Sequence, residues 1–192
     1  SEIQQDLFRP ILISSFMASD TFLRDWVLAG EHNEPEISRY LQEIRNRYGT
    51  VVSFFVSEKS RIYYHPDGIL KQVSPDAERD VWYFRVREMD EEYELNIDRD
   101  MANDDEMTVF VNYRVYDYDH NYVGATGVGL TVDSVTRLIE RYQQEYDSRI
   151  FFLDRDGNVT LAGSDFPDQV NSVFQAESYQ GFGDQFQAQA EN

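Results

Sequence analysis

Hydrophobic positions in the first 50 residues recur with the spacing of helices. The first series comprises Leu7, Ile11, Ala18 and Phe22 on one side, with Leu23 and Trp26 beside it. The second series comprises Ile37, Tyr40, Leu41, Ile44 and Tyr48. Gly30 and Gly49 follow the two series, and Asn33 and Glu36 have the spacing of a capping box. The pattern predicts two helices over residues 1–50.

The pattern changes to short β-rich runs at residue 51. Val51–Val56 and Arg61–Tyr64 are two such runs, and Ser57–Ser60 between them is typical of a turn. Residues 66–80 contain Pro66, Asp67-Gly68 and Ser74-Pro75, so we expect mostly loop there. Trp82, Tyr83 and Phe84 follow on a predicted short helix or turn.

Three further runs alternate between apolar and polar residues or are rich in Gly. They are Tyr93–Asp98, 107–116 and 122–132, with a turn at Asp117–Asn121 between the last two. They predict an antiparallel meander. A helix is expected from about Asp133, on the apolar stripe of Val135, Leu138, Ile139, Tyr142 and Tyr146. A further hairpin is expected from Ile150–Leu153 and Val159–Leu161, around Asp156-Gly157.

These elements predict an α+β fold, with a long N-terminal helix on a central antiparallel sheet and a smaller second α/β lobe. We expect residues 1–50 to form a helical stalk and a second helix, and residues 51–148 to form the sheet lobe. Residues 149–192 are expected to form a small second lobe that is truncated or partly disordered.

The charge balance excludes some classes of partner. The chain of 192 residues has 17 Lys+Arg and 36 Asp+Glu, a net charge of −19. This argues against nucleic acid and against anionic lipid surfaces. There is no Cys and no apolar run of the roughly 20 residues that a membrane span needs. Because the chain begins with Ser1, we expect it to be a piece of a longer protein.

Several acidic segments look superficially like metal sites. Asp117-x-Asp119-x-Asn121 and Asp154-x-Asp156-x-Asn158 have the first ligand spacings of a calcium loop but lack Gly at its sixth position. Hairpin turns use the same residue types. Residues 98–106 contain five acidic residues, typical of a solvated loop or of loose divalent binding. The three His have no metal-ligand spacing, so we expect no metal site and no cofactor.

The order of the elements and of several motifs resembles a known family. The motifs are residues 20–26 (DTFLRDW), 82–84 (WYF), 93–98 (YELNID), 110–115 (FVNYRV), 124–130 (GATGVGL) and 149–154 (RIFFLD). Together they are similar to the extracytoplasmic sensor domains of the double-CACHE class, also called PAS-like or PhoQ-DcuS-CitA folds. The likeness is to sensor regions of bacterial membrane-bound diguanylate cyclases and histidine kinases.

The resemblance implies a periplasmic sensory input domain of an inner-membrane protein. Residues 51–148 would be the membrane-distal, ligand-binding lobe and residues 149–192 the membrane-proximal one. Ligand binding would shift a helix and carry the signal across the membrane, commonly in a homodimer through the N-terminal helix. No catalytic motif occurs in the chain, so no enzymatic activity and no catalytic residue are expected.

The resemblance also indicates where a ligand would bind. The pocket of the family maps to Trp82, Tyr83, Asn96, Asp98, Asp100, Asn112 and Arg114. Aromatic walls and a few convergent polar groups suit a small polar molecule, including one with a cationic head group. The alternative is that Trp82 belongs to the core, that Asp98 ends a strand and that Asn112 faces solvent.

The chain departs from the amino-acid-sensing pattern of this family at two positions. That pattern has Arg two residues before its Trp-Tyr pair, where this chain has Asp80 beside Arg79. It also has Asp at the end of its Gly-rich strand, where this chain has Gly129. We therefore do not predict amino-acid sensing. A protein-interaction or structural module without a small-molecule pocket is the alternative function.

Overall fold

The computed structural model describes residues 2–147, 151–153 and 159–162, with side chains for residues 8–145 and 147. The chain divides into two compact units, Ser1–Thr131 and Val132–Asn192. The predicted boundary at residue 149 stays a prediction, and most of the predicted second lobe lies outside the described residues.

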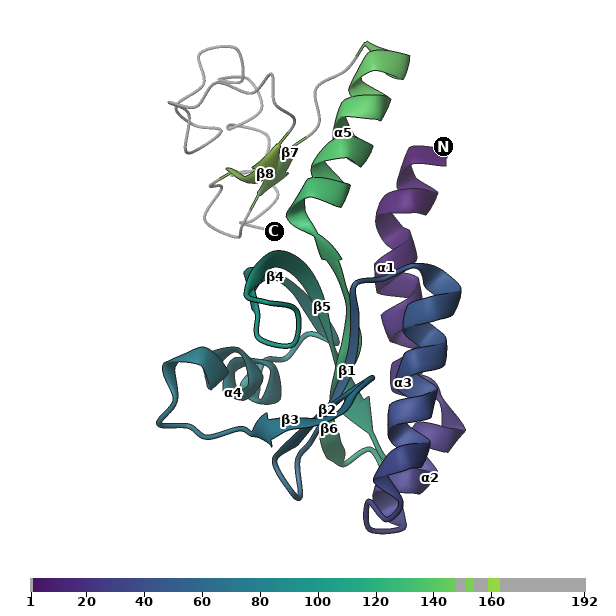
Figure 1. The fold of residues 1–192 in the computed structure, drawn as a ribbon, viewed down its shortest axis with the longest axis vertical. Coiled ribbons are helices and arrows are strands. Elements are labelled where there is room, and N and C mark those ends of the chain that lie inside the picture. Colours follow the sequence, from purple (N-terminus) through teal and green to yellow (C-terminus); the bar gives the residue numbers. More distant parts are fainter. Residues whose placement is uncertain (1, 148–150, 154–158, 163–192) are drawn as a thin grey trace. The chain divides into compact units, whose positions relative to one another are not determined.

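The first unit contains four α-helices, one 3₁₀ turn and six strands (Figure 1). The helices are α1 (Glu2–Ser19), α2 (Thr21–Leu28), α3 (Glu34–Tyr48) and α4 (Val81–Glu88), with the 3₁₀ turn η1 (Glu78–Asp80) before α4. The strands are β1 (Val52–Ser57), β2 (Ile62–His65), β3 (Gly68–Gln72), β4 (Tyr93–Asp100), β5 (Glu106–Tyr116) and β6 (Tyr122–Thr131).

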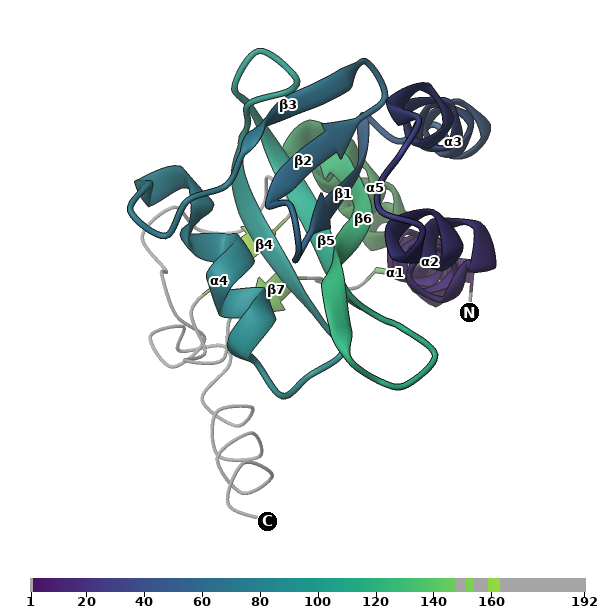
Figure 2. The ribbon, with the colours of Figure 1, turned by 90° about the horizontal axis from the view of Figure 1, so that it is seen from below.

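The six strands form one antiparallel sheet in the order β3-β2-β1-β6-β5-β4. Helices α1, α2 and α3 lie on one side of the sheet and α4 lies on the other (Figure 2). This is the predicted α+β, PAS-like fold.

Each face of the sheet has its own hydrophobic core. Phe55 on β1 belongs to the core under α1–α3, whereas Phe54 and Val56 belong to the core on the α4 face. Neighbouring residues on a strand point to opposite faces, and both faces are covered, so every residue of β1 is buried. The sheet can therefore carry a pocket on its α4 face while α1–α3 close the other face.

Local signals fix the ends of the helices. The Asp20 carboxylate accepts the backbone N–H of Phe22 (2.8 Å) and caps α2. The capping box predicted at Asn33 does not form, because Asn33 has a left-handed conformation (φ 67°) rather than the extended one of a capping residue. Gly49 ends α3 in a left-handed conformation (φ 65°), as predicted.

The prediction that residues 66–80 are mostly loop was wrong at β3. Gly68–Gln72 pairs with β2, for example through Tyr64 and Ile69. The Pro66-Asp67-Gly68 sequence forms the tight turn of a hairpin, with Gly68 at φ 118°, rather than the start of a long loop.

The second unit contains α5 (Val132–Tyr146) and a two-stranded antiparallel hairpin of β7 (Phe151–Leu153) and β8 (Val159–Ala162). The predicted stripe of α5 is present, since Val135, Ile139 and Tyr142 are buried. The turn at Asp156-Gly157 and the tail from residue 163 lie outside the described residues. In the part of the chain that the structure describes, no helix combines the length and apolar character that a membrane crossing needs.

Candidate functional site

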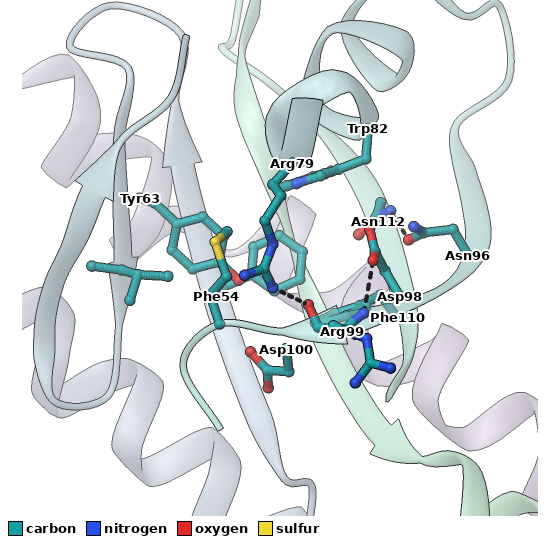
Figure 3. A pocket seen from close by; sticks show the side chains of 12 residues that line it. Phe54, Tyr63, Arg79, Trp82, Asn96, Asp98, Arg99, Asp100, Phe110 and Asn112 are labelled. Atoms are coloured by element: carbon teal, nitrogen blue, oxygen red, sulfur yellow. Dashed lines mark hydrogen bonds between the residues drawn. The ribbon is translucent and has the colours of Figure 1, made fainter. Parts of the chain in front are cut away.

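A pocket that is partly open to solvent lies on the α4 face of the sheet, and about 370 Å³ in and above it, open solvent included, is free of protein atoms (Figure 3). Five of the seven predicted site residues line it: Trp82, Asn96, Asp98, Asp100 and Asn112. Seven further residues complete the lining: Phe54, Tyr63, Leu70, Arg79, Arg99, Met101 and Phe110. The pocket therefore draws on β1–β5 and on the η1–α4 segment.

One wall of the pocket is aromatic. The ring of Phe54 on β1 is at the centre of this wall and meets Trp82 edge to face at 5.6 Å and Phe110 at 6.3 Å. Tyr63 on β2 lies beside it, 5.5 Å from Phe54 and 6.3 Å from Trp82. These rings belong to the core on the α4 face or pack against it, so hydrophobic burial fixes their positions.

The opposite wall is polar and is built by β4 and β5. Asn112 is buried, and its side-chain N–H group donates to Oδ1 of Asn96 (2.7 Å) and to Oε1 of Glu94 (3.3 Å). The carboxylate of Glu94 in turn accepts from Nη2 (2.6 Å) and Nε (2.8 Å) of Arg85 on α4. The alternative that Asn112 faces solvent is wrong. Instead, Asn112 connects the pocket to the ion pair that holds α4.

The two predicted acidic site residues differ in their surroundings. Asp98 is exposed, and its Oδ1 accepts the N–H of Arg99 (2.7 Å). Asp100 is 2% exposed, and its Oδ1 accepts the N–H of Ala102 (2.9 Å). Its Oδ2 is buried and has no hydrogen-bond partner among the described residues. Burial raises the pKa of the Asp100 carboxyl.

The two arginines of the pocket already have hydrogen-bond partners. Arg79 donates from Nη2 to Oδ1 of Asp105 (2.6 Å) and to the carbonyl of Arg99 (3.2 Å). Arg99 donates to the carbonyl of Asp105 (3.3 Å). These contacts tie η1 to the loop between β4 and β5 at the edge of the pocket.

Two predicted site residues do not line the pocket. Tyr83 is fully buried beside it, and its hydroxyl donates to Oε2 of Glu58 (2.8 Å). Arg114 donates to the carbonyls of Met89 and Arg87 at the end of α4. The sequence placed both on the correct elements. Arg114 shares the face of Asn112 on β5 but lies two residues further along, at the end of α4 rather than in the pocket, and the turn of α4 directs Tyr83 into the core.

The position occupied by Gly129 has no room for a side chain. A Cβ atom there would lie 2.6 Å from both Cγ2 of Thr108 and Cγ1 of Val52. The Asp that the amino-acid-sensing pattern places at this point therefore does not fit the present packing.

The metal-like segments do not form a metal centre among the described residues. Asp117 accepts the N–H groups of Asp119 (2.9 Å) and Asn121 (2.8 Å), and hydrogen bonding to Asn121 lowers the pKa of its carboxyl. This is the hydrogen bonding of a hairpin turn. The second such segment, 154–158, lies outside the described residues.

A scan against protein-family models finds no match for this chain. The following solved structures share the fold and are distant in sequence. The ligand-binding domain of the Pseudomonas fluorescens chemoreceptor CtaA, solved with L-serine, is 13% identical with a TM-score of 0.61, over 92% of this chain and 72% of that one. The Pseudomonas aeruginosa amino acid chemoreceptor PctC, solved with GABA, is 14% identical with a TM-score of 0.60, over 91% of this chain and 75% of that one.

The sensor domain of Escherichia coli DcuS is also similar, at 17% identity and a TM-score of 0.52, over 73% of this chain and 99% of that domain. The match to the sensory domain of Campylobacter jejuni chemoreceptor Tlp3 spans 61% of that domain. At these identities the comparisons establish the fold that the chain shares with bacterial sensor domains.

Proposed function

We propose that this chain is the periplasmic sensory domain of a membrane-anchored bacterial signalling protein, and that the pocket on the α4 face binds a small polar molecule. The observation that carries the proposal is the pocket itself, which combines aromatic rings with the buried amide pair of Asn96 and Asn112. Such a combination is typical of small-molecule sites. The shared fold supports the same function, because relatives in that fold were solved with GABA and L-serine.

The route of the signal is part of the proposal. Trp82 lies on α4, and the Asn112–Glu94–Arg85 contacts connect the polar wall to the same helix. A ligand that accepts a hydrogen bond from the side-chain amide of Asn112 competes with Glu94 for that donor. Loss of this bond would change how Glu94 holds Arg85 on α4. The output domain would be a diguanylate cyclase or a histidine kinase outside this chain, and this chain itself would have no enzymatic activity.

The N-terminal helix is proposed as the surface of a homodimer. Phe8, Leu12 and Phe16 are each more than half exposed and follow one another at intervals of four residues. Side chains at this spacing share one face of a helix. The chain has a net charge of −19, so two copies repel each other over most of their surface. The uncharged stripe avoids this repulsion and suits a two-fold contact with the same stripe of a second copy. The same stripe is the observation that favours the alternative, a protein-interaction module that uses no small molecule.

A thermal-shift panel of amines, carboxylates, amino acids, purines and divalent ions tests the proposal. A ligand that binds only the folded chain raises the melting temperature. We expect a hit that Trp82→Ala abolishes and Val81→Ala keeps, because Val81 precedes Trp82 on α4 but is exposed and outside the pocket. A panel without any hit, or a hit that is indifferent to Trp82, would favour the interaction module.

A further inference from the structure

The buried carboxylate of Asp100 is the group in the pocket whose bonding is incomplete. Its Oδ1 accepts one backbone N–H, and its Oδ2 is shielded from solvent with no partner among the described residues. A buried acceptor without a donor is unfavourable, and an ionised one more so. A hydrogen-bond donor or a positive charge that enters the pocket, which Asp100 lines, would remove this unfavourable free energy.

The positive side chains around the pocket already have hydrogen-bond partners. Arg79 is bound to Asp105, and Arg99 donates to the carbonyl of the same residue. Lys71 on neighbouring β3 is paired with Asp80 at 2.5 Å. A ligand carboxylate that binds Arg79 or Lys71 would have to break an ion pair, and it would also meet the negative charges of Asp98 and Asp100.

The apolar part of the lining suits a positively charged group. The rings of Phe54, Tyr63 and Trp82 border the pocket, and aromatic faces attract ammonium groups, methylated ones included. The lining therefore offers one buried negative charge and several ring faces, and Arg79, one of its two cations, is held in an ion pair with Asp105.

We infer that the pocket selects an organic cation that lacks a carboxylate, such as an alkylated amine, and that Asp100 is the residue that binds its charge. This inference rests on the proposed sensory function and narrows its ligand. It sets the chain apart from the compared chemoreceptor domains, which were solved with GABA and L-serine, both of them zwitterions. Asp98, which is exposed, has a minor role.

Calorimetric titration of the full chain with two matched probe sets tests the inference. The first set is n-butylamine, γ-aminobutyrate and butyrate, and the second is choline and betaine. We expect butylamine and choline to bind, and each carboxylate-bearing partner to bind at least about tenfold more weakly. Asp100→Asn should weaken binding of the cations by about 30-fold or more, because it removes a buried charge partner. Asp98→Asn should change it less than about threefold.

Each outcome bears on a different statement. Tighter binding of γ-aminobutyrate or butyrate than of the amines overturns the inference and leaves the sensory function in place. Amine binding that Asp100→Asn does not change overturns the role of Asp100. If none of the five probes binds, the inference fails, and the sensory function fails only if the wider thermal-shift panel also gives no hit. Trp82→Leu should weaken binding of choline more than binding of butylamine. That result would independently support a contact between the methylated ammonium group and the Trp82 ring.

Discussion

Nζ of Lys71 lies 2.5 Å from Oδ1 of Asp80, and this ion pair joins β3 to the turn that leads into α4. Asp80 is almost completely buried, and its Oδ2 also accepts the N–H of Ser74 (2.9 Å). The residue that stands in place of an Arg in the amino-acid-sensing pattern is thus used to fix the start of α4. The pair thus holds the backbone two residues before Trp82.

Lys71→Met should destabilise the fold by about 3 kcal/mol, because it leaves the Asp80 carboxylate buried without its cation. Urea unfolding of the variant measures this. Lys59→Met is the control, since Lys59 is exposed, and it should change the free energy of unfolding by no more than about 0.5 kcal/mol. Equal effects of the two variants would mean that the ion pair contributes nothing.

Asn112→Asp should destabilise the chain by about 2 kcal/mol, because it replaces the N–H donor of Asn112 by an acceptor facing Glu94 and Asn96. Asn96→Asp is the matched change on the other side of the bond. It keeps an acceptor for Asn112, so its effect should be clearly smaller. The same urea titration compares the two, and a larger effect at Asn96 would reverse the direction assigned to this hydrogen bond.

The stability contributed by Asp100 should depend on pH. Burial raises its pKa above the ordinary 3.8, so the folded chain binds this proton more tightly than the unfolded chain does. Its contribution to stability is therefore lost as the pH rises through the interval between these two pKa values. Asp100→Asn removes the charge and should stabilise the ligand-free chain by about 1–2 kcal/mol at neutral pH.

Urea unfolding of wild type and Asp100→Asn over a series of pH values measures this difference. The advantage of the variant should shrink as the pH falls toward 4 and the wild-type carboxyl becomes protonated. A difference that stays constant with pH would show that the carboxylate of Asp100 is not responsible.

The sequence predicted the sheet best where one face of a strand differs from the other. The alternation in β4 and β5 placed Asn96, Asp98 and Asn112 on a common side, and they line the pocket together. In β1 every position is buried because both faces are covered, and two Phe follow one another, so nothing in the pattern distinguished Phe54 from Phe55. That is why the central ring of the aromatic wall was missed.

Other parts of the site depend on contacts between distant residues. Leu70 was missed because a five-residue edge strand, β3, with two polar residues at its end reads as loop. Asp98 and Asp100 look equivalent in sequence, but the loop that begins at Met101 folds back and covers only Asp100. Arg79 was noted beside Asp80, yet only its bond to Asp105 shows that it closes one edge of the pocket.

The proposed dimer should depend on the exposed stripe of α1. Leu12→Glu places a charge in the middle of the stripe and should shift the chain from dimer to monomer in sedimentation velocity. Ile69→Glu is the control, because Ile69 is equally exposed but lies on β3. A wild-type chain that sediments as a monomer at every concentration tested would contradict the dimer of this chain.

The indole N–H signals of the two tryptophans test the central claim most directly. Trp82 lines the pocket, whereas Trp26 belongs to the core under α1–α3, so the chain carries one reporter on each face of the sheet. The measurement is a ¹⁵N-correlated NMR titration with the ligand found in the thermal-shift panel, with Trp82→Phe used to assign the signals. The account predicts that the Trp82 signal moves and saturates while the Trp26 signal moves little. A ligand that raises the melting temperature but shifts only Trp26, or neither signal, would contradict a binding site on the α4 face.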